Sequence, residues 1–188
     1  MSELSGLIWV KRFPGSNSTS DLISSFRTNL ESFLAALKAA GASIHISATL
    51  RPPERAYLMH YAWGIARDSI NPSTVPPMPG VDIDWAHKLP DGTIDSAKSK
   101  QAAEEMIGPR GYNMVQRAAL TSRHTEGRAV DMNISWRGNL VIKKKDGSEI
   151  TIDTEPRDET NTSLHSVGAS YGVIKLLSDP PHWSDDGH

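Results

Sequence analysis

Cysteine is absent from this 188-residue chain. Disulfide bonds and thiolate metal sites are therefore excluded, and a transition-metal site would have to be built from histidine and carboxylate. Long apolar runs are also absent, since no segment approaches the roughly twenty apolar residues that span a bilayer. We therefore expect no membrane insertion.

A strong net charge is missing as well, and the N-terminal residues lack the pattern expected of a secretory signal. The formal net charge of −2 gives no overall attraction to nucleic acid or to anionic membranes, so nucleic acid is not an expected partner. The apolar run from Leu7 to Val10 is shorter than the roughly seven to fifteen residues of a signal-peptide core, and Glu3 stands where positive charge is usual. We expect synthesis in the cytoplasm without a signal peptide.

The bulk composition is that of a soluble globular protein. Hydrophobic residues make up 38% and charged residues 22% of the chain. This length is sufficient to bury one substantial core, and the sequence contains no internal repeats. We therefore predict a single domain over residues 1–188.

Apolar periodicity and turn residues outline the secondary structure. The expected strands are mostly antiparallel, and the five prolines of residues 71–95 indicate a long ordered loop. Together these elements predict an α+β fold in which helices flank a small antiparallel sheet. We expect helices over 21–40, 53–67, 96–107, 112–120 and 161–170, strands over 44–50, 127–134 and 173–177, and a hairpin of 139–143 with 149–153 across Asp146-Gly147.

The stretch from Ser122 to Asp131 contains the most informative chemistry. His124 lies before Gly127, which allows the chain to turn, and Asp131 follows on a predicted strand, on the same face as the small Ala129. Two histidines and one carboxylate, with a fourth position left for water, are typical of catalytic zinc. An isolated histidine such as His124 is more often a hydrogen-bonded loop residue than a metal ligand. A zinc site would also need a third ligand from elsewhere in the chain.

The segment from Asp179 to Trp183 offers a second histidine, His182, with a carboxylate three residues before it. A metallopeptidase needs a carboxylate near the attacking water to move its proton. In an extended chain, residues i and i+3 point to opposite faces, so Asp179 and His182 converge only if Pro180-Pro181 bends. The alternative is a proline-rich surface loop with an exposed Asp179.

These motifs resemble a known family. The pattern S-x-H-x-x-G-x-A-x-D is similar to that of the zinc peptidases that include D-alanyl-D-alanine carboxypeptidases and phage L-alanyl-D-glutamate endolysins. The resemblance covers about residues 44–188, leaves out the helix over 21–40, and implies a hedgehog-like peptidase fold. It also implies Zn²⁺ as cofactor, His124, Asp131 and His182 as its ligands, and Asp179 as the general base.

The branch of the family follows from one residue type. Many members use glutamate as the base, but Asp179 within Asp-x-Pro-His-aromatic looks like the endolysin branch, which cleaves between L-alanine and D-glutamate. One alternative is a D-alanyl-D-alanine carboxypeptidase or dipeptidase. Another is a non-catalytic zinc-binding interaction module, which resembles the hedgehog signalling domain; the carboxylate at position 179 argues against it.

Two weaker candidates accompany these residues. The segment from Ala48 to Pro52 resembles a degenerate form of the family pattern S-G-Y-R-S, which implies that Arg51 binds a substrate carboxylate or the developing oxyanion. A salt bridge near a helix start is the alternative role for Arg51. Ser122 either orients the His124 loop or a substrate carbonyl, or caps a turn.

The other histidines are weaker candidates still. His45, His60 and His165 are expected to have structural roles, whereas His87 in the long loop is a candidate for a substrate groove. We also expect that removing residues 179–188 abolishes zinc binding and that removing only 185–188 is tolerated.

The resemblance implies the peptidoglycan stem peptide as substrate and action at the cell wall or periplasm after release or non-classical secretion. The setting is either a phage endolysin released through a holin or a secreted antibacterial effector, for which an immunity protein would be a partner.

Overall fold

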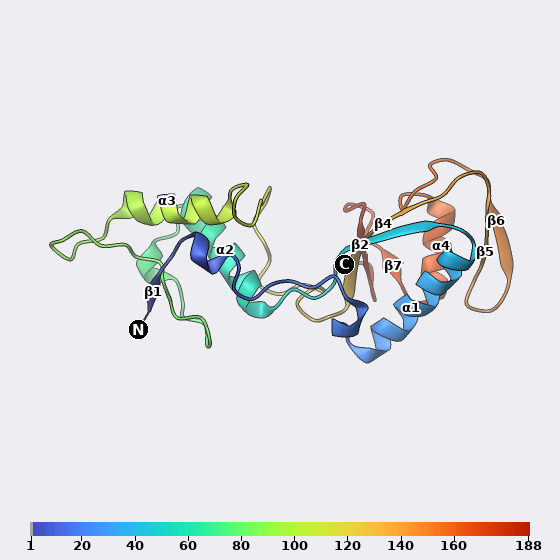
Figure 1. The fold of residues 1–188 in the computed structure, drawn as a ribbon, viewed down its shortest axis with the longest axis horizontal. Helices are drawn as coiled ribbons and strands as arrows, with labels where there is room; N and C mark the ends of the chain where they lie inside the picture. Colours follow the sequence, from blue (N-terminus) through green and yellow to red (C-terminus); the bar gives the residue numbers. More distant parts are fainter. Residues whose placement is uncertain (1) are drawn as a thin grey trace. The chain divides into compact units, whose positions relative to one another are not determined.

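The computed structural model describes residues 2–188, and its contacts divide the chain into two compact units (Figure 1). The helical unit joins the residues up to Pro14 with Pro52–Thr121, and the sheet unit joins Gly15–Arg51 with Ser122–His188. No helix within residues 2–188 combines the length and apolarity needed to cross a membrane. The single domain expected over 1–188 stays a prediction.

The helical unit packs two helices over one apolar core. Pro53 occupies the first turn of its first helix, as expected, and Asp95 caps the second by accepting a hydrogen bond from the backbone N–H of Lys98. Trp85 is buried in this core, so the loop over 71–95 is ordered as predicted. The elements are β1 (Glu3–Leu4), η1 (Leu7–Trp9), α2 (Pro53–Arg67), η3 (Pro72–Thr74), β3 (Ile83–Asp84) and α3 (Ser96–Ile107), with β1 parallel to β3.

The helix predicted over 112–120 is wrong. The backbone N–H of Tyr112 donates to the carbonyl of Met106 at 2.7 Å, and that of Met114 donates to Ile107 at 2.9 Å. These amides satisfy the last carbonyls of α3 instead of starting a new helix. Asn113 adopts a positive φ of 51°, which a continuing helix does not allow.

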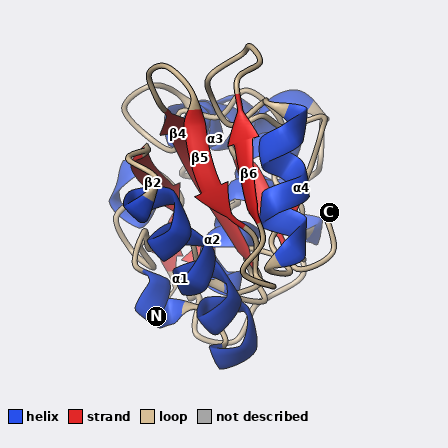
Figure 2. Ribbon diagram, turned by 90° about the vertical axis from the view of Figure 1, so that its right-hand side faces the viewer, coloured by secondary structure: helices blue, strands red, loops and turns tan. Residues whose placement is uncertain are grey.

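The sheet unit combines two helices, a four-stranded antiparallel sheet in the order β2-β4-β8-β7, and a separate hairpin of β5 with β6. The hairpin and both helices can be followed in Figure 2. The predicted α+β class is therefore confirmed. The elements are η2 (Thr19–Asp21), α1 (Ser24–Ala39), β2 (Ser43–Ala48), β4 (Ala129–Ser135), β5 (Leu140–Lys143), β6 (Glu149–Ile152), α4 (Thr162–Ser170), β7 (Ile174–Lys175) and β8 (His182–Ser184).

The core of this unit lies between α1, α4 and the inner face of the sheet. Along β4, Val130, Met132 and Ile134 are buried in the core, whereas Asp131 lies on the opposite face. The helix expected over 21–40 is present as α1, which buries one apolar face, and Gly41 follows its end with a φ of 85°. Its buried residues are Phe26, Leu30, Phe33, Leu34 and Leu37.

Strand β8 is a feature that the sequence did not predict. No strand was expected there, and a proline-rich surface loop was the alternative for Asp179–Trp183, but His182–Ser184 pairs with β4 on one side and with β7 on the other. A strand of three residues has little periodicity of its own, and its pairing on both sides determines its structure.

Candidate metal centre

Asp131 and His182 are brought together by strand register. They are directly opposite one another in the antiparallel pair of β4 and β8. Their neighbours Val130 and Trp183 are also opposite one another, and both are fully buried in the core. Because side chains alternate between the faces of a sheet, Asp131 and His182 share the face turned away from the core.

His124 comes from the turn that precedes β4. The carbonyl of Ser122 accepts hydrogen bonds from the backbone N–H groups of Thr125 and Glu126, which closes this turn. Gly127 follows with a φ of 67°, and its carbonyl accepts a hydrogen bond from the backbone N–H of Ile23. A Cβ at position 127 would lie 3.3 Å from that nitrogen, so both the conformation and the space favour glycine.

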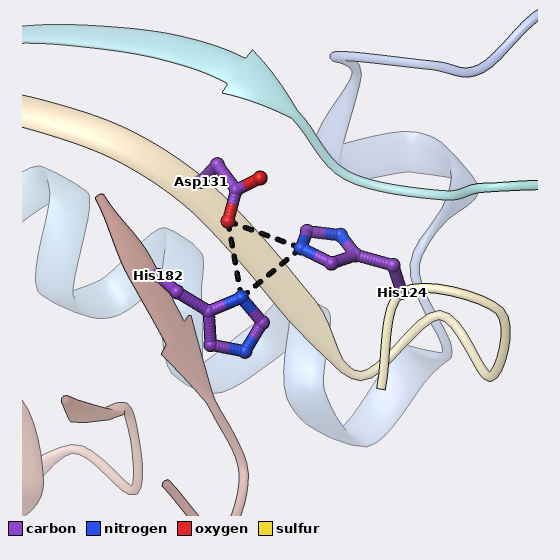
Figure 3. Close-up of side chains that lie close together, drawn as sticks. All are labelled: His124, Asp131 and His182. Carbon is purple, nitrogen blue, oxygen red and sulfur yellow. Dashed lines mark hydrogen bonds and ion pairs between the residues drawn. The ribbon is translucent and has the colours of Figure 1, made fainter. Parts of the chain in front are cut away.

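The three side chains converge on one another (Figure 3). His124 Nε2 lies 3.0 Å from Asp131 Oδ1 and 3.1 Å from His182 Nδ1. His182 Nδ1 lies 3.1 Å from the same Asp131 oxygen. Within residues 2–188 these three form the one cluster of histidine and acidic side chains that could hold a metal ion.

The outward nitrogens of both rings are bonded to backbone carbonyls. His124 Nδ1 donates to the carbonyl of Thr49 at 2.6 Å, and His182 Nε2 donates to the carbonyl of His188 at 3.1 Å. Each bond fixes the tautomer and leaves the inward nitrogen, His124 Nε2 or His182 Nδ1, with its lone pair directed at the cluster.

This donor set fits a zinc ion. Ligand atoms of a tetrahedral zinc with bonds of about 2.0–2.1 Å are separated by about 3.3 Å, close to the 3.0–3.1 Å observed here. The cluster consists of two ring nitrogens and one carboxylate oxygen, and all three are acceptors. Acceptors this close repel one another unless a shared cation or protons lie between them. The histidines are buried and Asp131 is half-buried, so solvent screens their repulsion poorly.

The cluster shifts the pKa values of Asp131 and His182 in opposite directions. Burial disfavours the charge of Asp131, but the hydrogen bonds and charges of His124 and His182 outweigh burial and lower the pKa of that carboxyl well below its ordinary value. Burial lowers the pKa of His182, but the hydrogen bond with Asp131 and the smaller effects of the His188 carbonyl and the Asp131 and Asp179 charges give a net rise. Metal and protons therefore compete for these atoms.

The Pro180-Pro181 segment bends. The backbone N–H of His182 donates to the carbonyl of Asp179 at 3.0 Å, and that of Asp179 donates to Leu176 at 3.3 Å, so two consecutive turns precede β8. Asp179 thus lies beside His182 rather than across an extended chain. Its side chain is exposed, and it is not one of the three clustered donors.

The two weaker candidates lie beside His124. The backbone N–H of Arg51 donates to the carbonyl of His124 at 3.0 Å. Ser122 Oγ accepts a hydrogen bond from the backbone N–H of Thr125 at 3.4 Å, and the Ser122 N–H donates to Thr125 Oγ1 at 2.9 Å, which is a turn-capping arrangement. Both residues therefore border the loop that carries a ligand.

The remaining histidine candidates lie outside the cluster. His45 is exposed on β2, and His165 Nε2 contacts the carbonyl of Glu159. His60 and His87 belong to the helical unit, where His60 contacts the carbonyl of Ala118 and His87 is buried against Ser5. His87 is only 6% exposed and its Nε2 lies 3.1 Å from Ser5 Oγ, so its ring packs inside the helical unit. Its candidacy for a substrate groove stays a prediction.

Sequence reasoning missed the groups that hold the ligands in place. The carbonyls of Thr49 and His188 have no sequence signal, because every residue has one. The sequence did give an indication of Lys175. On the strand expected over 173–177 it points to the same face as Val173, which is buried, and a buried lysine is unusual.

Comparison with known proteins gives little. No protein-family model matches the chain, and no curated protein matches it significantly. Among solved structures, the chain is similar to a mutant of the vancomycin-resistance D,D-pentapeptidase VanY, from a VanB-type resistance cassette, in complex with Zn(II). The identity is 16% and the TM-score is 0.36, over 92% of this chain and 79% of the VanY chain. A similarity of this degree assigns neither family nor activity.

Proposed function

We propose that this protein is a zinc peptidase that hydrolyses the stem peptides of peptidoglycan. The observation that carries the proposal is the convergence of His124 Nε2, His182 Nδ1 and an Asp131 oxygen, with both rings held in the matching tautomer by backbone carbonyls. Three protein ligands leave a zinc coordination position for water or substrate, which is the arrangement of catalytic rather than structural zinc.

Zinc bound there would supply Lewis-acid polarisation of the scissile carbonyl and of the attacking water. The chain itself supplies the proton transfers. Asp179 is exposed, and its turn places it next to His182, so we assign it the general base. Its carboxylate takes a proton from the water that attacks the carbonyl carbon and returns it to the amine when the C–N bond breaks.

Arg51 is proposed to bind a substrate carboxylate or the oxyanion, because its backbone is anchored to the His124 loop and its guanidinium is always charged. For Ser122 we propose that the hydroxyl which caps the His124 turn also orients that loop or a substrate carbonyl.

The bond proposed for cleavage is the one between L-alanine and D-glutamate. The support is the motif resemblance, in which an aspartate at position 179 followed by Pro180-Pro181-His182-Trp183 looks like the endolysin branch. An endopeptidase accepts peptide on both sides of the scissile bond, so it does not depend on a free terminal carboxylate. A carboxypeptidase does, and this difference separates the two activities.

The experiment is the digestion of purified peptidoglycan by the zinc-loaded protein. New amino termini and released amino acids are then identified by mass spectrometry. We expect D-glutamate amino groups without free D-alanine, and an almost unchanged rate when the terminal carboxylate of the stem peptide is blocked. D-Alanine as the main product would show carboxypeptidase activity, and no new termini at all would favour a zinc-binding module without catalysis.

We further propose that the protein acts at the wall after release through a holin or delivery by a secretion system. Periplasmic targeting by a fused signal in a Gram-negative host should cause lysis, and cytoplasmic expression should not. Lysis that persists in the His124→Ala variant would show that it does not depend on the metal centre, which would contradict the proposal. In the effector setting, the producing strain would also need an immunity protein.

A further inference from the structure

Lys175 is a buried cation next to the metal centre. It lies on β7 directly opposite Trp183 of β8, and only 7% of its surface is exposed. Its Nζ lies 5.7 Å from the centroid of the Trp183 ring. A buried ammonium is costly unless its N–H groups are satisfied, so its acceptors show what it is used for.

The acceptors are three backbone carbonyls of a single loop. Lys175 Nζ donates to the carbonyls of Leu176, Asp179 and His182, the last at 3.0 Å. An ammonium has three N–H donors, so this set satisfies the charge completely. The three carbonyls belong to every third residue of the segment that carries the proposed base and the ligand His182.

The same three residues also bond one another in a ring. The N–H of Leu176 donates to the carbonyl of His182 at 3.1 Å, that of Asp179 to Leu176 at 3.3 Å, and that of His182 to Asp179 at 3.0 Å. Each carbonyl thus accepts one amide and one ammonium hydrogen, which uses both of its lone pairs. The ring closes around the ammonium, and without it each of the three carbonyls would lose one of its two hydrogen-bond donors.

We propose that Lys175 is a positioning residue of the metal centre. Its ammonium holds the ring of Leu176, Asp179 and His182 closed, and thereby fixes both the direction of the His182 imidazole and the place of the Asp179 carboxylate. The role of Asp179 as a base rests on the proposed function, whereas the effect on metal binding requires only the three-residue cluster.

The test is the zinc affinity of Lys175→Met, measured by competition with a chelator, together with the visible spectrum of the cobalt-substituted protein. Methionine keeps the length and apolar stem but removes the charge and the donors. We expect zinc binding to weaken by about tenfold to a hundredfold, the range for partners that orient metal ligands, and the cobalt spectrum to change. Unchanged affinity and spectrum in the folded variant would overturn the proposal.

Two controls separate positioning from general stability. Lys143→Met removes an exposed lysine from β5, and Ile142→Val destabilises the buried face of the same strand, which is not part of the ligand-bearing sheet. Both should bind zinc like the unmodified protein. An equal loss of affinity in Ile142→Val would show that Lys175 acts through stability alone.

If Lys175→Met does not fold, the unmodified protein still tests the proposal. Nuclear magnetic resonance should detect scalar couplings across hydrogen bonds from Lys175 Nζ to the carbonyl carbons of Leu176, Asp179 and His182. A freely exchanging ammonium without these couplings would overturn it. Both readouts need only the metal or the protein alone, so a failure to hydrolyse peptidoglycan would refute the proposed function and leave this inference standing.

Discussion

Asp131 and His182 face each other across two antiparallel strands, although fifty-one positions separate them in the sequence. Their meeting depends on the register of β4 with β8, which the buried pair Val130 and Trp183 fixes from the other face. A slip by one residue would turn a ligand into the core and a core residue to the solvent. The geometry of the centre is therefore set by core packing.

The first prediction concerns metal content. The unmodified protein should bind about one zinc per chain, and His124→Ala or His182→Ala should reduce this to near zero, because each removes one of three protein ligands. Elemental analysis after dialysis measures it. His45→Ala, on an exposed position of β2, is the matched control and should retain zinc; full zinc in either ligand variant would disprove the assignment.

The second concerns the base. Asp179→Asn should keep its zinc and its fold while turnover of peptidoglycan falls by orders of magnitude, because the amide cannot accept the proton. Zinc content, circular dichroism and the rate of new amino termini are the measurements. Asp153→Asn, an exposed change beyond β6, should have no effect. If Asp179→Asn loses zinc along with activity, Asp179 is a ligand instead.

The third revises an expectation from the sequence, that residues 185–188 are dispensable. The His188 carbonyl orients His182, and Asp185 and Asp186 form ion pairs with Arg123, the neighbour of His124. A chain that ends at Ser184 should bind zinc about tenfold more weakly. Chelator competition tests this.

A second variant separates the carbonyl from the ion pairs. The double change Asp185→Asn with Asp186→Asn keeps the His188 carbonyl and should have only a small effect, since ion pairs as open to solvent as these, about a third exposed, contribute little. Unchanged affinity in the shortened chain would restore the original expectation.

The fourth concerns pH. Burial lowers the pKa of His165, and the hydrogen bond with the Glu159 carbonyl offsets this only in part. Below about pH 6.5 the imidazole of His165 therefore takes up a proton more readily in the unfolded chain than in the folded one. The free energy of unfolding decreases as the pH is lowered, until the pKa of the folded state is reached. In metal-free protein, the urea midpoint should drop more between pH 7.5 and 5.5 than in His165→Gln. Equal drops would contradict this.

Local patterns predicted what local physics determines. The apolar face of α1 and the Asp146-Gly147 hairpin appear as expected, because helix periodicity and turn residues act over a few positions. His124 and Asp131 were found because they belong to one short motif. The helix over 112–120 was wrong because its first amides complete α3 instead.

Long-range and backbone features lay beyond the sequence. Strand β8 exists because β4 and β7 pair with it, and the Thr49 carbonyl that orients His124 belongs to a segment seventy-five positions away. The alternation along the strand expected over 173–177 indicates that Lys175 points inward, but not that its ammonium binds three backbone carbonyls. Nothing in the residue types encodes such partners.

The central claim is that His124, Asp131 and His182 hold a zinc ion, and anomalous diffraction at the zinc edge from crystals of the zinc-loaded protein tests it most directly. The account predicts one strong peak within bonding distance of His124 Nε2, His182 Nδ1 and an Asp131 oxygen, with Asp179 outside that distance. A peak at another place, or bonding through His124 Nδ1 or His182 Nε2, would contradict it.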